Sequence, residues 1–344
     1  MRIAVMGSGG TGGYFGGLLS RAGEEVTFIA RGAHLEALRM RGLKVKSRLA
    51  GEFTLPVRAV ATPNEVGPVD LILFCVKTYD TDAAAESIRP LIGADTMLLS
   101  LQNGVDNAEH IARIAGHDSG LGAAAYVVSA IEAPGVIAQT AGSGKIILGA
   151  LGGGMGARIE RLQDVLQRAE ISAEVHSDVR IAIWQKFLFI CAFSGVTALT
   201  RMSIGSILAD QATHALFRGT LEETEVVARG GGIALPEDCV EQALATAAAV
   251  EPWGRSSLYH DLVHERRLEL EALNGEVVRR GHEHDIRTPL NFAIYAALKP
   301  YINGAPILPL SPSDSPPTAP RSSPQPSSAA RSWLFAWRCR MSPL

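Results

Sequence analysis

The fold of this chain is decided near its N-terminus, by the stretch Arg2-Ile3-Ala4-Val5-Met6-Gly7-Ser8-Gly9-Gly10-Thr11-Gly12. Its first five residues form a mostly apolar run of the kind that becomes a strand buried on both faces. The glycines that follow fit the pattern G-x-G-x-x-G, and Tyr14–Ala22 then has the composition of a helix. Between a strand and a helix, this pattern indicates a turn that binds a dinucleotide. An ordinary glycine-rich turn is the alternative.

Each glycine of the pattern has a physical task in such a turn. Gly7 permits the tight turn, Gly9 lets the backbone approach a pyrophosphate, and Gly12 lets helix and strand pack closely. The free N–H groups and the positive dipole end of the helix then face the phosphates. The candidate cofactor-binding residues of the turn are Gly7, Ser8, Gly9, Gly10, Thr11 and Gly12.

The end of the second predicted strand indicates which dinucleotide is bound. This strand covers Glu25–Ala30 and ends at Arg31, 24 positions after Gly7. In NAD-binding chains, an acidic residue about 20 positions after the glycines binds the ribose 2′-hydroxyl. Here an arginine stands at the strand end. Because a guanidinium pairs well with a 2′-phosphate, we expect NADP(H). The alternative is a solvated surface arginine.

Length and composition restrict the class of protein. At 344 residues the chain exceeds one typical domain, and 47% hydrophobic residues are ample for a buried core. A formal net charge of −3 without a basic block argues against a nucleic-acid partner. The four cysteines form no C-x-x-C pair, which is typical of reduced thiols in a cytoplasmic protein. A strand starting at Arg2 leaves no room for a signal peptide, so we expect none.

The order of predicted elements divides the chain. Strands alternate with helices as far as Ala173–His176, and this βαβ order predicts a Rossmann-type, doubly wound and mostly parallel sheet over 1–177, the NADP(H)-binding domain. An all-helical substrate or catalytic domain is expected over 178–303. The residues 304–344 hold 9 of the chain's 18 prolines and many serines, so we expect a disordered tail.

Within this scheme, a short helix is expected at Gly32–Arg41. Strand-like pieces are expected at Leu121–Ile131, Val136–Gln139 and Lys145–Leu151, and later helices at Asp178–Thr200, Ala212–Gly230, Pro236–Val250, Leu262–Gly281 and Leu290–Tyr301.

Two polar residues follow buried strands of the first domain. Lys77 comes after the predicted strand Val69–Val76, and Asn103 comes after Thr96–Leu101. In open α/β sheets ligands gather at the carboxyl ends of the strands, so both residues are candidates for cofactor contacts. A surface lysine and a turn asparagine before Gly104 are the alternatives.

Lys186 stands out in the second domain. Asp178 is a good N-cap for a long helix whose body, Ile181–Phe193, is apolar nearly all round. Gln185 and Lys186 inside this run argue against a membrane span and favour a buried central helix. Lysine is rarely buried unless it is paired or functional, and burial would lower its pKa. A lysine that extends to the helix surface is the alternative.

Other polar clusters give weaker signals. Ser256–Asp261 is a polar stretch that could bind a carboxylate. The histidines of this region have no convincing set of metal-binding partners, so no metal site is assigned.

Taken together, these motifs resemble those of the ketopantoate reductase (2-dehydropantoate 2-reductase) family over about residues 1–306. The matching pieces, in family order and spacing, are Gly7–Gly12, Cys75-Val76-Lys77, Gln102-Asn103-Gly104, Trp184-Gln185-Lys186, Thr197-Ala198-Leu199, Ser256-Ser257 and Glu269…Asn274-Gly275.

The resemblance implies an NADPH-dependent reduction of a 2-keto acid to a 2-hydroxy acid. It implies that Lys186 gives a proton to the ketone oxygen, and that Asn103 touches both cofactor and substrate. Glu269 would lie near the reacting centre and the cofactor, and Lys77 would join Arg31 near the cofactor phosphate. Substrate contacts are expected from Ser194, Ser256 and Ser257, with Ser257 on the carboxylate.

The chain departs from the family pattern in one place. Ile190, Ser194 and Ile204 stand where the family has asparagines after its catalytic lysine. This puts the substrate in doubt, and a reductase for a less polar 2-keto acid is an open alternative. A non-catalytic NADP(H)-binding sensor and a β-hydroxyacid dehydrogenase for another substrate also stay open. We expect no nucleic-acid or membrane partner. The sequence leaves the oligomeric state open, with a homodimer among the options.

Overall fold

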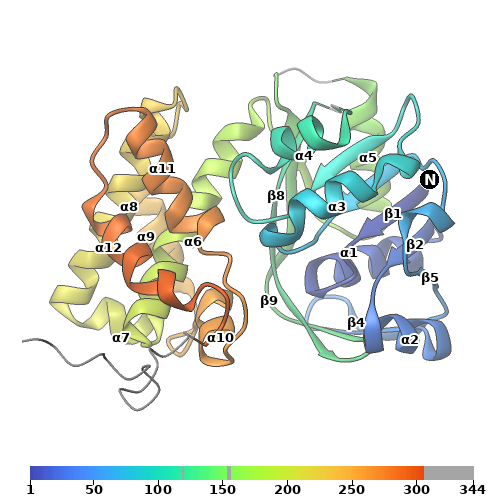
Figure 1. Cartoon of the computed structure of the whole chain (residues 1–344), viewed down its shortest axis with the longest axis horizontal. Coiled ribbons are helices and arrows are strands. Elements are labelled where there is room, and N and C mark those ends of the chain that lie inside the picture. The colour runs from blue at the N-terminus through green and yellow to red at the C-terminus, as the bar shows by residue number, and fades with distance from the viewer. Residues whose placement is uncertain (118–119, 153–155, 306–344) are drawn as a thin grey trace, which may run out of the picture. The chain divides into compact units, whose positions relative to one another are not determined.

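The computed structural model describes residues 1–117, 120–152 and 156–305 (Figure 1). By its contacts, Met1–Ala305 is one compact unit. The predicted tail over 304–344 therefore lies outside the described residues except for Gly304 and Ala305. The domain boundaries at 177 and 303 stay predictions. The last strand nevertheless ends at Val175 and every longer element after it is a helix.

The first sheet is the predicted parallel one. Its strands, in spatial order, are β5 (Arg58–Val60), β2 (Glu25–Ile29), β1 (Arg2–Met6), β6 (Leu71–Phe74) and β7 (Met97–Ser100). All four neighbouring pairs are parallel, and β1 lies between β2 and β6. The order of strands reverses at β1, and in such sheets ligands bind beside that point, at the carboxyl ends.

Both faces of this sheet are covered, as expected for a doubly wound fold. On β1, Ile3 and Val5 belong to one hydrophobic cluster and Ala4 belongs to another, because successive side chains of a strand point to opposite faces. The first cluster includes α1 (Gly10–Arg21), and the second includes α3 (Thr81–Ser87) and α4 (Asn107–Ala115). The predicted helix Gly32–Arg41 is present as α2 with the same bounds.

A second sheet was not predicted. Its strands are β10 (Ala173–Val175), β9 (Val136–Ala150), β3 (Leu43–Ser47) and β4 (Gly51–Leu55), with β8 (Leu121–Ala133) paired to β9. The prediction of separate short strands over 136–151 is wrong. The chain runs through as one strand, with Gly142 and Gly144 at positive φ and register shifts along the β8–β9 pair, so it bends instead of ending.

Helix α1 lies between the two sheets and contains five glycines. An ideal Cβ on Gly16 would come within 2.7 Å of the Phe28 ring of the first sheet. One on Gly13 would come within 2.6 Å of Ile137 of the second sheet. Larger side chains at these positions would push the sheets apart, so the helix that opens the dinucleotide turn is clamped on both sides.

The remaining helices, except the first of them, form the second part of the fold. They are α5 (Ala157–Arg168), which still belongs to the first part, and then α6 (Val179–Thr200), α7 (Ile204–Ala209), α8 (Gln211–Gly230), α9 (Cys239–Ala249), α10 (Ser257–Val263), α11 (Glu276–Glu283) and α12 (Pro289–Leu298). Asp178 caps α6 as predicted, since its side chain accepts the N–H of Arg180 at 3.1 Å.

Helix α6 is the central helix of this part. It packs against α8, α9, α10 and α12. Among the described residues it is the one helix long and apolar enough to cross a membrane, but 67% of its most apolar window is buried inside the protein. That burial is what a core helix shows, in agreement with the prediction of a buried central helix.

The predicted helix over 262–281 is wrong in its first half. Helix α10 ends at Val263, Glu265 has a φ of +54°, and Arg267 forms an isolated β-bridge with Asn303. A π-helical turn over Glu271–Gly275 then leads into α11. The left-handed residue stops the helix, and the extended segment that follows holds Glu269. Turns of the π type are frequent at functional sites.

Candidate active site

A cavity of about 2110 Å³ opens at the carboxyl end of the first sheet. Its walls come from the glycine turn after β1, the loops after β6 and β7, and one face of α6 and of α9. Pockets for a single small ligand usually measure roughly 300–1,000 Å³. This cavity therefore has room for a dinucleotide and a second small molecule together.

The glycine turn has the form that a pyrophosphate requires. Gly7 has a φ of +93°, and a Cβ there would meet the backbone N of Val76 at 2.7 Å. Nothing lies within 4 Å of a Cβ built on Gly9, so the backbone is open on that side. The N-terminus of α1 has no side-chain cap and no acidic residue in its first turn. Its N–H groups are thus free for an anion, and the residues present fit the phosphates of a dinucleotide.

Two buried polar atoms beside this turn were missed by sequence reasoning. His34 Nε2 and Ser129 Oγ have no hydrogen-bond partner among the described residues, and both residues line the cavity. The Gly135 N–H donates to His34 Nδ1 at 3.1 Å, and burial lowers the pKa of His34, so the neutral ring holds its proton on Nε2. Buried polar atoms without partners are rare, and these two remain available to a ligand.

Arg31 lies at the mouth of the same region. It precedes α2, its side chain is 84% exposed, and its Nη2 donates to Asp80 at 2.5 Å. Because a guanidinium has five N–H donors, this contact leaves others free. Asp80, which also lines the cavity, was not anticipated as a partner.

Lys77 is held by two carboxylates. Its Nζ lies 2.7 Å from Glu269 and 3.1 Å from Asp261, whose side chains are only 11% and 12% exposed. Glu269 also accepts the backbone N–H of Thr78 at 2.9 Å and the Thr78 hydroxyl at 3.1 Å. Burial opposes the charge on Lys77, but the two carboxylates outweigh it and raise its pKa. The loop after β6 is thereby tied to the extended segment before the π-helical turn.

This placement refines the sequence-based expectation. Lys77 and Glu269 were expected in separate roles, whereas the structure pairs them. Lys77 donates to one carboxylate oxygen of Glu269, and Thr78 donates to the other. Asp261, the third member, was predicted only as part of a polar stretch. No local pattern in the sequence indicates the contact between Lys77 and Asp261, because the two residues are 184 positions apart.

Lys186 of α6 also lines the cavity. It is half-buried in the cavity wall, and its ammonium makes no hydrogen bond or ion pair with any residue that the structure describes. Burial lowers the pKa of Lys186 to about 8, and the nearby Glu269 carboxylate opposes that shift. An ammonium with such a pKa can both stabilise a developing oxyanion and give up its proton near neutral pH.

The other predicted residues are placed as follows. Asn103 lines the cavity, and its backbone carbonyl accepts a hydrogen bond from Asn107 at 3.0 Å, while its side chain has no hydrogen bond to a residue that the structure describes. Ser257 is exposed in the cavity wall, and the buried Ser194 of α6 also lines the cavity.

Ser256 differs from these residues, because its hydroxyl caps α10. It accepts the Tyr259 N–H at 3.0 Å and also accepts from the Thr197 hydroxyl at 2.8 Å. This hydroxyl is used by the fold itself.

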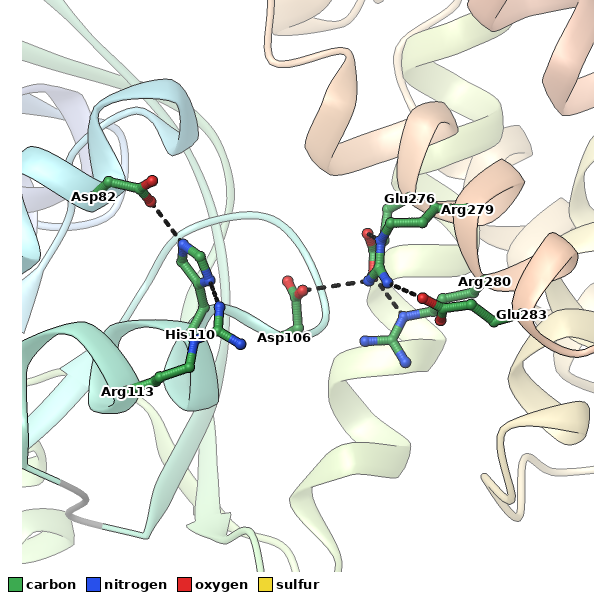
Figure 2. A network of polar contacts seen from close by, with 8 residues as sticks. All are labelled: Asp82, Asp106, His110, Arg113, Glu276, Arg279, Arg280 and Glu283. Atoms are coloured by element: carbon green, nitrogen blue, oxygen red, sulfur yellow. Dashed lines mark hydrogen bonds and ion pairs between the residues drawn. The ribbon is translucent and has the colours of Figure 1, made fainter.

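A polar network fastens the loop that holds Asn103 (Figure 2). Asp106, three residues further on, lies 3.6 Å from Arg279 of α11. Glu276, nearly buried, receives hydrogen bonds from both Arg279 and Arg280 at 2.5 Å. The Arg280 guanidinium lies 5.5 Å from the centre of the Trp184 ring, two residues before Lys186. The network therefore connects the loop after β7 with the helix of Lys186.

The fold and this cavity define the class of protein. A dinucleotide turn and an unpaired ammonium face one space, which is the arrangement of an oxidoreductase that acts on a CH–OH group or the corresponding carbonyl.

Comparison with known proteins gives the family. Residues 3–153 match the family described as ketopantoate reductase PanE/ApbA, and residues 178–302 match its C-terminal counterpart. The 2-dehydropantoate 2-reductase of Halobacterium salinarum is 32% identical over 84% of this chain and 95% of its own length. The crystal structure of a PanE/ApbA family ketopantoate reductase from Ralstonia eutropha JMP134 is 33% identical, with a TM-score of 0.81 over 88% of this chain and 98% of that one.

A more distant likeness concerns the fold alone. The structure of D-mandelate dehydrogenase with NADH and anilino(oxo)acetate has a TM-score of 0.79 over 88% of this chain and 98% of that chain, at 22% identity. The chain belongs to the ketopantoate reductase family. It is an oxidoreductase of the type that reduces 2-keto acids.

Proposed function

We propose that this protein reduces a 2-keto acid to the 2-hydroxy acid with NADPH. The observation that supports this most directly is Lys186, whose ammonium lines the same cavity as the glycine turn and has no partner among the described residues. NADPH, when bound, supplies the hydride. The protein then has to orient the keto acid, stabilise the charge that develops on the ketone oxygen, and protonate that oxygen.

The side chains divide these tasks. Lys186 holds a proton on Nζ and delivers it to the ketone oxygen, which is consistent with its pKa of about 8. Asn103 has a free amide that can donate to the substrate and accept from the cofactor ribose. Ser257 and Ser194 offer hydroxyls to the substrate. Ser256, whose hydroxyl is engaged as a cap, acts by holding Ser257 in place.

Glu269 and Lys77 act as a positioned pair near the reacting groups. The carboxylate of Glu269 favours the charged ammonium of Lys186 and so opposes the lowering of the Lys186 pKa by burial. Lys77 neutralises Glu269 and lines the cavity, so its ammonium is within the region where a cofactor would lie. Its contact with the cofactor phosphate stays a proposal.

The direct test is a panel of 2-keto acids, ketopantoate included, followed by the loss of reduced nicotinamide. Oxidation of NADPH with at least one 2-keto acid, and formation of the matching 2-hydroxy acid, is the expected result. Tight binding of NADPH without turnover of any 2-keto acid would instead identify a sensor.

Replacing Arg31 with alanine should weaken NADPH binding selectively. A charge-assisted contact with the 2′-phosphate contributes roughly 1.5–3 kcal/mol, so the Kd for NADPH should rise about ten- to a hundredfold. The Kd for NADH should change little, because NADH has no 2′-phosphate. Titration of both cofactors, followed by fluorescence, measures this.

Arg41→Ala is a suitable control for Arg31→Ala. Arg41 ends the same helix α2, but its guanidinium donates to the carbonyl of Pro134 and does not line the cavity. An equal loss of NADH and NADPH affinity in Arg31→Ala would refute the assignment of the 2′-phosphate site.

We also propose a cytoplasmic location. The family suggests a place in pantothenate biosynthesis, which requires efficient reduction of ketopantoate, and the panel of 2-keto acids tests it. The free thiols of Cys75, Cys191 and Cys239 support a reducing compartment. A homodimer stays a prediction.

A further inference from the structure

The face of α6 that holds Lys186 continues as an apolar wall of the cavity. Phe189, Ile190 and Phe193 follow Lys186 by three, four and seven residues and all line the cavity. With a rise of 1.5 Å per residue, the first two lie about 4.5–6 Å along the helix from Lys186 and the third about 10 Å. A substituent on the keto carbon would therefore meet this wall within one helical turn of the ammonium.

The two phenylalanines present a flat aromatic surface. Their ring centroids are 5.3 Å apart and the ring planes differ by only 12°, so the rings are stacked. Both side chains are half-buried, which leaves part of each ring facing the cavity. Aromatic groups pack favourably in offset-stacked or edge-to-face arrangements, so a third ring can extend this pair.

Helix α9, which packs against α6, borders the same cavity. Helix α9 contributes Ala243, Thr246 and Ala249 to the lining, side chains that are small and uncharged. Stacked rings on α6 and small side chains on α9 thus line one cavity, a combination that suits a planar apolar group.

The same wall disfavours a substrate with hydroxyl groups. Ile190 has no hydrogen-bonding group, and the Ser194 side chain is shorter than an amide. A site that leaves a desolvated substrate hydroxyl unpaired rejects that substrate relative to one without it.

We infer that the cavity selects 2-keto acids with an aromatic side chain, and that Phe189, Ile190 and Phe193 are the residues that determine this specificity. The inference rests on the proposed function, because it assigns the substrate class of that same reaction. The keto and carboxylate groups would be held near Lys186, Asn103 and Ser257 as for any 2-keto acid, and the aromatic group would lie along α6.

The test compares kcat/KM with NADPH for phenylpyruvate, phenylglyoxylate, ketopantoate and 2-oxobutanoate. The better aromatic substrate should exceed both ketopantoate and 2-oxobutanoate by at least about tenfold. Phe193→Leu, which keeps an apolar side chain but removes the ring, should lower kcat/KM for the aromatic substrates several-fold more than for 2-oxobutanoate. Ile190→Asn should shift the ratio toward ketopantoate. Phe292→Ala is the matched control, because Phe292 lies on α12, is 56% exposed and does not line the cavity.

The outcomes separate the two proposals. If no 2-keto acid is reduced, the proposed function fails, and the substrate inference with it. If NADPH is oxidised with ketopantoate or 2-oxobutanoate as efficiently as with the aromatic acids, only the inference is overturned. The same holds if Phe193→Leu lowers kcat/KM equally for all four substrates.

Discussion

Replacing Lys186 with alanine should lower kcat for keto-acid reduction by about 10²–10⁴-fold, the usual contribution of a general acid. NADPH should still bind, because the glycine turn and Arg31 do not depend on this ammonium. The reason for the loss is that Lys186 has no other partner among the described residues, so its charge and proton are free for the substrate oxygen. Single-turnover kinetics and a cofactor titration separate the two effects.

The pH dependence follows from the pKa of about 8 for Lys186. Reduction requires the protonated ammonium, so kcat should be constant below that pH and fall as the pH rises through about 8. In the reverse direction, oxidation of the 2-hydroxy acid requires the neutral amine, so its rate should rise over the same range.

Two further variants test the role of the proton. Lys186→Arg keeps the charge but cannot release a proton near neutral pH, so it should not restore turnover. Lys145→Ala is the control, since Lys145 pairs with Glu174 outside the cavity. Normal turnover in Lys186→Arg would show that the residue contributes charge only.

Replacing Lys77 with methionine should reduce the free energy of unfolding by about 2–3 kcal/mol. Removing one partner of a buried ion pair typically costs about 3–5 kcal/mol, and the cost is smaller here because the Lys77 side chain is 42% exposed. The variant removes the lysine that Asp261 and Glu269 share, and leaves Asp261 with the exposed Arg266, 3.7 Å away. Urea denaturation measures the change.

The pH dependence of this effect has a definite sign. The carboxylates raise the pKa of Lys77 in the folded protein, so its contribution to stability is complete below the pKa of an unfolded lysine, about 10.4. The difference in the free energy of unfolding between wild type and Lys77→Met should therefore stay constant from pH 7 to pH 9. It should shrink only as the pH rises above about 10.4.

Lys44→Met is the matched control for Lys77→Met. Lys44 is about as exposed as Lys77 and pairs with Glu52 at 2.5 Å, but the Glu52 side chain is 59% exposed. Because water solvates that carboxylate after the lysine is lost, Lys44→Met should cost clearly less stability than Lys77→Met. The double variant Lys77→Met/Glu269→Gln should recover part of the stability, because it removes one of the uncompensated charges. Equal costs for Lys77→Met and Lys44→Met would contradict a coupled cluster.

Local patterns in the sequence determined the parts of this protein that depend on neighbours in the chain. The strand–glycine–helix stretch Arg2–Arg21, the helix Gly32–Arg41 and the Asp178 cap of α6 were all predictable, because backbone conformation and helix capping are set within a few residues. Lys186 was also predictable, since one charged residue in an apolar helix stands out in any fold.

The tertiary structure alone decided which distant residues meet. Nothing in the sequence around Lys77 shows that it pairs with Glu269, 192 positions later. Nor does the sequence show that the hydroxyl of Ser256 accepts a hydrogen bond from Thr197. The break after Val263 was hidden in the same way, because the apolar spacing of a helix persists through a segment that instead pairs with Asn303. The predicted short strands over 136–151 are one strand in the structure, because pairing with β8 continues along its length. The sequence by itself thus determined the dinucleotide turn and the reactive lysine, and contacts between distant segments determined the shape of the cavity around them, because packing and charge pairing depend on distance in space.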